Sequence, residues 1–136
     1  MANADPIAEK AKRTPITIKV FFLPYLFVGL PPKIAPIQVV IIPIYYSKED
    51  RENIVQKARQ IKDSLSNSDI RVHLDDRDYL TPGFKFNDWE LKGIPIRIEI
   101  GPKDIAKNQV VLVRRHNQTK ISPDIDGLPE KILSDL

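Results

Sequence analysis

The sequence predicts an α/β domain with a mixed sheet. Three observations support this class: a β-branched apolar run at residues 37–46, a stretch of helical periodicity directly after it, and a strand pattern at residues 94–100. Strand and helix patterns alternate first, and two further strand patterns follow, as expected of an α/β fold. The 136 residues are enough for one domain preceded by an arm.

The first half of the domain is predicted from residues 37–67. The segment 37–46, IQVVIIPIYY, is almost wholly apolar and favours a central strand buried on both faces. Pro43 lacks an amide hydrogen, so it predicts a bulge in this strand or its end. Ser47, followed by Asp50, predicts a helix start, and Asn67 predicts its end. The helix would bury one stripe of apolar side chains: Ile54, Val55, Ala58, Ile61 and Leu65.

The second half is predicted to add shorter elements. Residues 70–74 alternate as a strand, and a polar loop follows. Pro82 and Gly83 predict a turn, and residues 85–92 predict a short helix that ends at Gly93. The remaining expected elements are a strand at 94–100, a short helix at 104–107, strands at 109–115 and 119–121, and a helix at 128–136.

Polar and aromatic residues surround the strand at 94–100. Isoleucine occupies every second position of this strand, so Arg97 and Glu99 share the opposite face. Further residues lie before and after the strand: Phe86, Trp89, Glu90, Lys103 and Asp104. Trp89 is better explained as a core residue than as a stacking platform. Aromatic rings with fixed polar groups are the means by which proteins read single-stranded RNA bases.

The sequence indicates neither a catalytic centre nor a metal or cofactor site. It contains no cysteine and only two histidines, His73 and His116, which are too far apart in sequence to suggest zinc. The aspartates of residues 75–78 lack the spacing of a calcium loop. No Gly-rich phosphate loop, GxSxG or HExxH motif occurs. The net charge is +3, with a local basic excess at 103–120 that includes Arg114 and Arg115; we expect these arginines to contact RNA.

Residues 1–30 are predicted to form a basic and then apolar arm. The apolar run from residue 20 to 30 is too short to span a membrane, and we expect no membrane contact. This run predicts either an extra strand that covers part of the core or a contact surface for a partner. A ribosome or a synthetase catalytic subunit, bound through residues 14–30, would be such a partner. The absence of cysteine suits a reducing compartment, and we expect a cytoplasmic protein.

From residue 31 to about 123 the chain resembles the anticodon-binding domain of prolyl-tRNA synthetase of the archaeal and eukaryotic type. The stretches PPKIAPIQVVIIPI, DDRDYLTPGFKFNDWELKGIPIRIEIGPKD and QVVLVRR carry this resemblance. It implies the anticodon-binding fold of class II synthetases, with a five-stranded mixed sheet and about three helices. It also implies that the domain reads the two guanines of the proline anticodon. The positions that match the family's contacts are Phe86, Glu90, Arg97, Lys103 and Asp104.

Three hypotheses about function follow. The first is a stand-alone, non-catalytic RNA-binding module that binds tRNA or ribosomal RNA, in association with the ribosome in the latter case. The second is the anticodon-recognition part of a prolyl-tRNA synthetase that acts with a separate catalytic domain. The third is a structural or dimerisation protein that reuses the fold without binding RNA. The polar set around residues 94–100 argues against the third hypothesis, because a scaffold would not need it.

Overall fold

The computed structural model describes residues 30–136, so the predictions for the arm at residues 1–29 lie outside the described part. A short 3₁₀ helix, η1 (Pro32–Ile34), precedes the main elements. These are β1 (Val39–Pro43), α3 (Lys48–Asn67), β2 (Val72–Leu74), α4 (Pro82–Leu91), β3 (Ile96–Ile100), α5 (Pro102–Ala106), β4 (Val111–Arg114), β5 (Lys120–Ile121) and α6 (Leu128–Asp135).

The strands form one five-stranded sheet in the order β2-β1-β3-β4-β5. β1 is parallel to both of its neighbours, whereas β3 with β4 and β4 with β5 are antiparallel. The predicted α/β class and mixed five-stranded sheet are therefore confirmed. The described residues contain four α-helices, of which three have seven or more residues.

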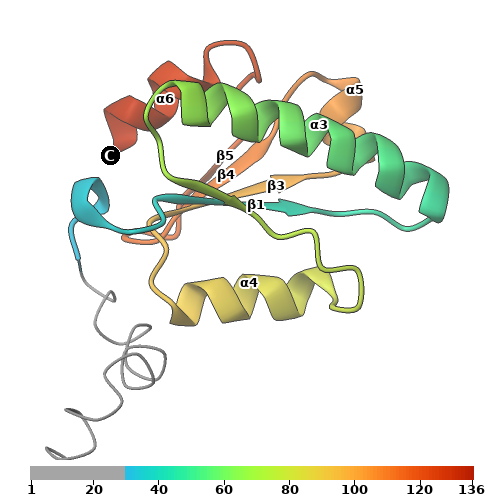
Figure 1. Cartoon of the computed structure of the whole chain (residues 1–136), viewed down its shortest axis with the longest axis horizontal. Helices are drawn as coiled ribbons and strands as arrows, with labels where there is room; N and C mark the ends of the chain where they lie inside the picture. The colour runs from blue at the N-terminus through green and yellow to red at the C-terminus, as the bar shows by residue number, and fades with distance from the viewer. Residues whose placement is uncertain (1–29) are drawn as a thin grey trace, which may run out of the picture.

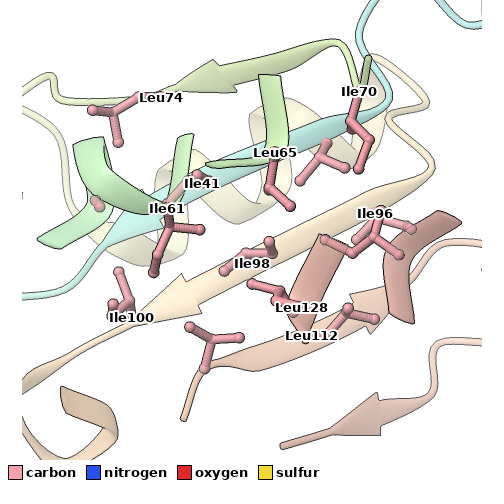
Figure 2. Close-up of a cluster of buried hydrophobic side chains, with 14 of the residues drawn as sticks. Ile41, Ile61, Leu65, Ile70, Leu74, Ile96, Ile98, Ile100, Leu112 and Leu128 are labelled. Atoms are coloured by element: carbon pink, nitrogen blue, oxygen red, sulfur yellow. The ribbon is translucent and has the colours of Figure 1, made fainter. Parts of the chain in front are cut away.

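The helices cover the two faces of the sheet unequally. α3 and α6 lie on one face, and α4 lies on the other (Figure 1). The larger core fills the space between the sheet and α3, where isoleucine and leucine side chains from β1, β3, β4 and α3 meet (Figure 2). Burial of each such side chain contributes about 1.5–3 kcal/mol. This core therefore fixes the position of β3, which carries the polar residues of interest.

The start and the buried stripe of α3 agree with the prediction. The Ser47 side chain accepts a hydrogen bond from the Asp50 amide at 3.1 Å, which satisfies an amide that has no partner within the helix. All five predicted stripe residues are buried: Ile54, Val55, Ala58, Ile61 and Leu65. The prediction that β1 is buried on both faces is also confirmed, and Pro43 is its last residue.

The predicted turn at Pro82 and Gly83 is wrong, because these residues form the first turn of α4. Thr81 is the N-cap, and its hydroxyl accepts a hydrogen bond from the Phe84 amide at 3.2 Å. Proline is tolerated here because the first amides of a helix have no intrahelical acceptor, so no hydrogen bond is lost. The helix therefore starts three residues earlier than its apolar pattern indicated.

The strand at 94–100 begins later than predicted, at Ile96. Gly93 adopts a left-handed conformation with φ of 73° after the last turn of α4, and Ile94 and Pro95 lead into the strand. Ile94 packs beside Trp89 and Val40, whereas Ile96 belongs to the larger core. The four isoleucines therefore do not share one face, because Ile94 lies outside the extended segment to which the alternation applies.

Candidate nucleic-acid interface

Arg97 and Glu99 lie on the sheet face that α4 covers only in part. Both belong to β3, and Arg97 is paired in register with Val40 of β1 and Val113 of β4. A shallow hollow opens there, between the end of α4 and the turn from β4 to β5. Its lining combines an apolar floor with a polar rim: Val40, Trp89, Glu90, Ile94, Arg97, Val113, Arg115 and Gln118.

The guanidinium of Arg97 is held from two directions. Its Cζ lies over the ring of Phe86, 4.4 Å from the centroid. Its Nε and Nη2 donate hydrogen bonds to Oε2 of Glu99 at 3.1 and 2.9 Å. A cation over an aromatic face contributes about 0.5–2 kcal/mol. One face of the Phe86 ring is thus occupied by the arginine, so Phe86 supports Arg97 in this structure.

Glu90 lies at the rim of the hollow, in the last turn of α4, and is exposed. Gln118, in the turn from β4 to β5, donates from Nε2 to Oε1 of Glu90 at 3.4 Å and to the backbone oxygen of Arg115 at 3.1 Å. The Glu90 carboxylate accepts hydrogen bonds only, so it suits the donors on the Watson–Crick edge of guanine. Arg97, as a donor, suits the guanine oxygen.

Lys103 and Asp104 lie beyond the other end of β3, in α5. Oδ2 of Asp104 accepts a hydrogen bond from the Gly101 amide at 2.9 Å, which fixes the chain as it leaves the strand. The Lys103 side chain is exposed. This is the edge at which parallel β1 and β3 both end, where open α/β sheets bind ligands. Arg97 and Ile100 are three residues apart along β3, which corresponds to about 10 Å.

The two arginines predicted from the basic segment lie on different faces. Arg114 pairs in register with Ile96, and its Nε and Nη2 donate to Oδ2 of Asp135 at 3.0 and 2.7 Å, which joins β4 to α6. Arg115 lines the hollow and donates to the backbone oxygens of Gly93 and Leu30 at 2.5 and 3.2 Å. Of these two, only Arg115 lies beside Arg97.

α4 is anchored by a buried carboxylate, Asp75, at the end of β2. Trp89 Nε1 donates to Asp75 Oδ2 at 2.7 Å, and Arg77 donates from Nε and Nη2 at 2.8 and 2.7 Å. Nζ of Lys85, itself 2% exposed, donates to the Asp75 backbone oxygen at 3.2 Å. Burial alone would raise the pKa of Asp75, but the hydrogen bonds from Arg77 and Trp89 outweigh it and hold this pKa well below its usual range.

The interpretation of Trp89 as a core residue is confirmed, but the partner of its indole could not be deduced from the sequence. Asp75 and Trp89 are fourteen residues apart, in a loop and in a helix. Glu99 was expected beside Arg97 but not as its hydrogen-bond partner, and Gln118 was not expected near the hollow. The alternation at 94–100 does place Glu99 beside Arg97, whereas only the pairing of β4 with β5 brings Gln118 to the hollow.

Residues 30–136 contain neither a cluster of metal ligands nor a membrane-spanning helix. No group of three or more histidine, aspartate or glutamate side chains within residues 30–136 could hold a metal ion. No helix in this part of the chain is long and apolar enough to cross a membrane.

Residues 38–135 match the protein family described as "Anticodon binding domain". The chain belongs to this family. It is 45% identical over 103 residues to a proline–tRNA ligase of Pyrobaculum arsenaticum and 50% identical over 107 residues to one of Ruminiclostridium cellulolyticum. It is also 55% identical over 86 residues to the chloroplastic/mitochondrial proline–tRNA ligase of Arabidopsis thaliana. The resemblance to the prolyl-tRNA synthetase domain is therefore confirmed.

The similarity covers most of this chain but a small part of each relative. The matched residues are 76%, 79% and 63% of this chain, respectively, and 21%, 21% and 16% of the three relatives. The chain thus spans about a fifth of the length of the relatives it matches, and that fifth is their anticodon-binding part.

Proposed function

We propose that this domain binds the anticodon region of proline tRNA. The contacts would come from the sheet face on which α4 lies and from the C-terminal end of β3, where α5 begins. The observation that carries the proposal is the guanidinium of Arg97, which lines an open hollow and is held by Phe86 and Glu99. The family and the names of the relatives supply the class of RNA. The resemblance implies that the two guanines of the proline anticodon are read.

The residues of the site would divide the recognition between two places. Arg97 would donate to the oxygen of one guanine, and Glu90 would accept from its nitrogen donors. Lys103 and Asp104 would meet the neighbouring nucleotide, because their position beyond β3 is about 10 Å or more from Arg97. Phe86 would act through Arg97, since the arginine occupies one face of its ring.

The whole protein would then serve translation as the anticodon-recognition part of a proline–tRNA ligase, in the cytoplasm. The relatives support this reading over a ribosomal one, because each of those compared is named a proline–tRNA ligase. A role on ribosomal RNA would need the same face to bind ribosomal subunits. The binding experiment therefore includes both kinds of RNA.

The test compares Arg97→Ala with Arg59→Ala in filter binding to a proline tRNA transcript and to ribosomal subunits. Arg59 is a suitable control because it lies on α3, on the other face of the sheet, with a side chain that is 64% exposed. We expect Arg97→Ala to lose about 10–100-fold in affinity for the tRNA, the magnitude of one base contact. Arg59→Ala should change it less than twofold. Equal losses in the two variants, or binding to ribosomal subunits alone, would refute the proposal.

A further inference from the structure

Glu99 is a buried carboxylate on the face proposed to bind RNA. Its side chain is 8% exposed, and it lies in the middle of the sheet, paired in register with Ile42 of β1 and Val111 of β4. A buried ion pair adds little net stability, because the removal of two charges from water offsets their attraction. The effect of Glu99 is therefore to be sought in the geometry that it imposes on its partner.

The partner of Glu99 is Arg97, and the contact involves only one edge of the guanidinium. Both hydrogen bonds come from the side edge of the guanidinium, formed by Nε and Nη2, and both end on the same oxygen, Oε2. The Arg97 Cζ lies over the ring of Phe86, 4.4 Å from its centroid. The end edge, which carries one Nη1 hydrogen and the second Nη2 hydrogen, has no hydrogen-bond partner among residues 30–136. This edge is left to meet a ligand.

Glu99 also changes the charge that a ligand encounters. Paired with a carboxylate at 2.9 Å, the arginine attracts a phosphate group less than a lone guanidinium would. Its remaining hydrogens can still donate to a base oxygen, since that contact depends on direction more than on net charge. Lys120 Nζ, 4.0 Å from the same Glu99 oxygen, completes the cluster at its exposed side.

We propose that Glu99 is a positioning residue that makes Arg97 selective for a base over the phosphate backbone. It does so by occupying the side edge of the guanidinium and by balancing its charge. This inference rests on the proposed function, because it assigns the specificity of that same site. It adds that the preference for guanine at this position depends on a side chain that does not itself contact the RNA.

The domain offers a matched internal control in Arg114 and Asp135. This pair has the same two-to-one geometry, with distances of 3.0 and 2.7 Å and side chains that are 16% and 12% exposed. It lies on the opposite face of the sheet, toward α6. Asp135→Asn therefore removes a comparable carboxylate from a comparable arginine without touching the proposed RNA face.

The experiment measures the affinity of the full chain for two proline tRNA transcripts, one natural and one with an anticodon guanine replaced by adenine, over a range of salt concentrations. The wild-type chain should prefer the natural transcript. Glu99→Gln should reduce this preference about tenfold, mainly through tighter binding of the adenine transcript. The slope of log K against log salt should steepen by about one, as expected when one more cation meets a phosphate.

Two further variants separate geometry from charge. Glu99→Asp keeps the charge but withdraws the carboxylate by one methylene, so the preference should fall while the salt slope stays unchanged. Asp135→Asn should leave both the preference and the slope unchanged, although it also breaks an ion pair. Thermal unfolding of each variant confirms that the protein tested is folded.

The outcomes distinguish the inference from the proposed function. An undiminished preference in Glu99→Gln or in Glu99→Asp would overturn the positioning role while leaving anticodon binding intact. An equal loss in Asp135→Asn would also overturn it, because the effect would then come from the fold as a whole. A wild-type chain that shows no preference between the two transcripts would overturn both proposals.

Discussion

The substitution Asp75→Asn should strongly destabilise the domain, because Asp75 is the centre of the network that holds α4. Its side chain is fully buried and accepts three short hydrogen bonds from Trp89 and Arg77. Lys85 Nζ lies 3.9 Å from Oδ1. An asparagine would keep the shape of the side chain but remove its charge. Its NH2 group cannot accept a hydrogen bond, so it would face an N–H donor of Arg77 or Trp89 without pairing with it.

The magnitude follows from the burial of the partners. Removal of one member of a buried ion pair costs about 3–5 kcal/mol, because the other member is left uncompensated. Lys85 is 2% exposed, so solvent cannot replace Asp75. Domains of this size have total stabilities of roughly 5–15 kcal/mol. A loss of 3 kcal/mol would lower Tm by about 12–24 °C, which calorimetry and urea denaturation can measure.

The pH dependence tests whether charge is responsible. The pKa of Asp75 is lowered in the folded state, whereas an unfolded aspartate has a pKa of about 3.9. The ionised group therefore contributes its full stability above about pH 4 and loses it progressively as the pH falls toward the folded pKa. The difference in stability between the wild type and Asp75→Asn should accordingly shrink between pH 6 and pH 3.

The control for this experiment is Asp88→Asn. Asp88 also pairs with Arg77, at 3.2 Å, but its side chain is 26% exposed, so its loss should cost no more than about 1 kcal/mol. The reasoning would be refuted if Asp75→Asn cost no more than Asp88→Asn. It would equally be refuted if the effect of Asp75→Asn did not change with pH, since the loss would then come from packing alone.

Two smaller predictions concern the ends of helices. Ser47→Ala removes the cap of α3 and should cost about 1 kcal/mol in urea denaturation, with Ser66→Ala, an exposed position near the end of the same helix, as the control. Gly127→Ala should cost about 1–2 kcal/mol although nothing lies within 4 Å of the added methyl, because φ there is 79°. A neutral Gly127→Ala, or a Ser47→Ala no worse than its control, would contradict these expectations.

The parts of the fold that could be predicted are those set by local patterns. The buried stripe of α3 and its cap at Ser47 follow from residues close together in sequence, and so does the apolar run of β1. The start of α4 could not be deduced with the same security. A proline and a glycine in succession suit both a turn and a first helical turn, and only the cap at Thr81 decides between them.

The resemblance named the residues of the candidate site but could not give their geometry. The resemblance supplied Arg97 and Lys103 together, whereas the structure places them at different points along and beyond β3. The structure also places the ring of Phe86 over the guanidinium of Arg97, a contact that the sequence did not specify. These relations depend on how α4 lies across the sheet, which no spacing in the sequence specifies.

The position of α4 links the buried network to the exposed face, because two stripes of the same helix serve the two purposes. Lys85 and Trp89, four residues apart, point toward Asp75. Phe86 and Glu90 are displaced from them by one position, at the same spacing, so they form the adjacent stripe beside Arg97 and the hollow. A shift of the helix on its buried side would therefore move the side proposed to bind RNA by the same amount. The network of Lys85 and Asp75 thereby fixes the position in which Phe86 meets Arg97, and with it the geometry of the face proposed to bind RNA.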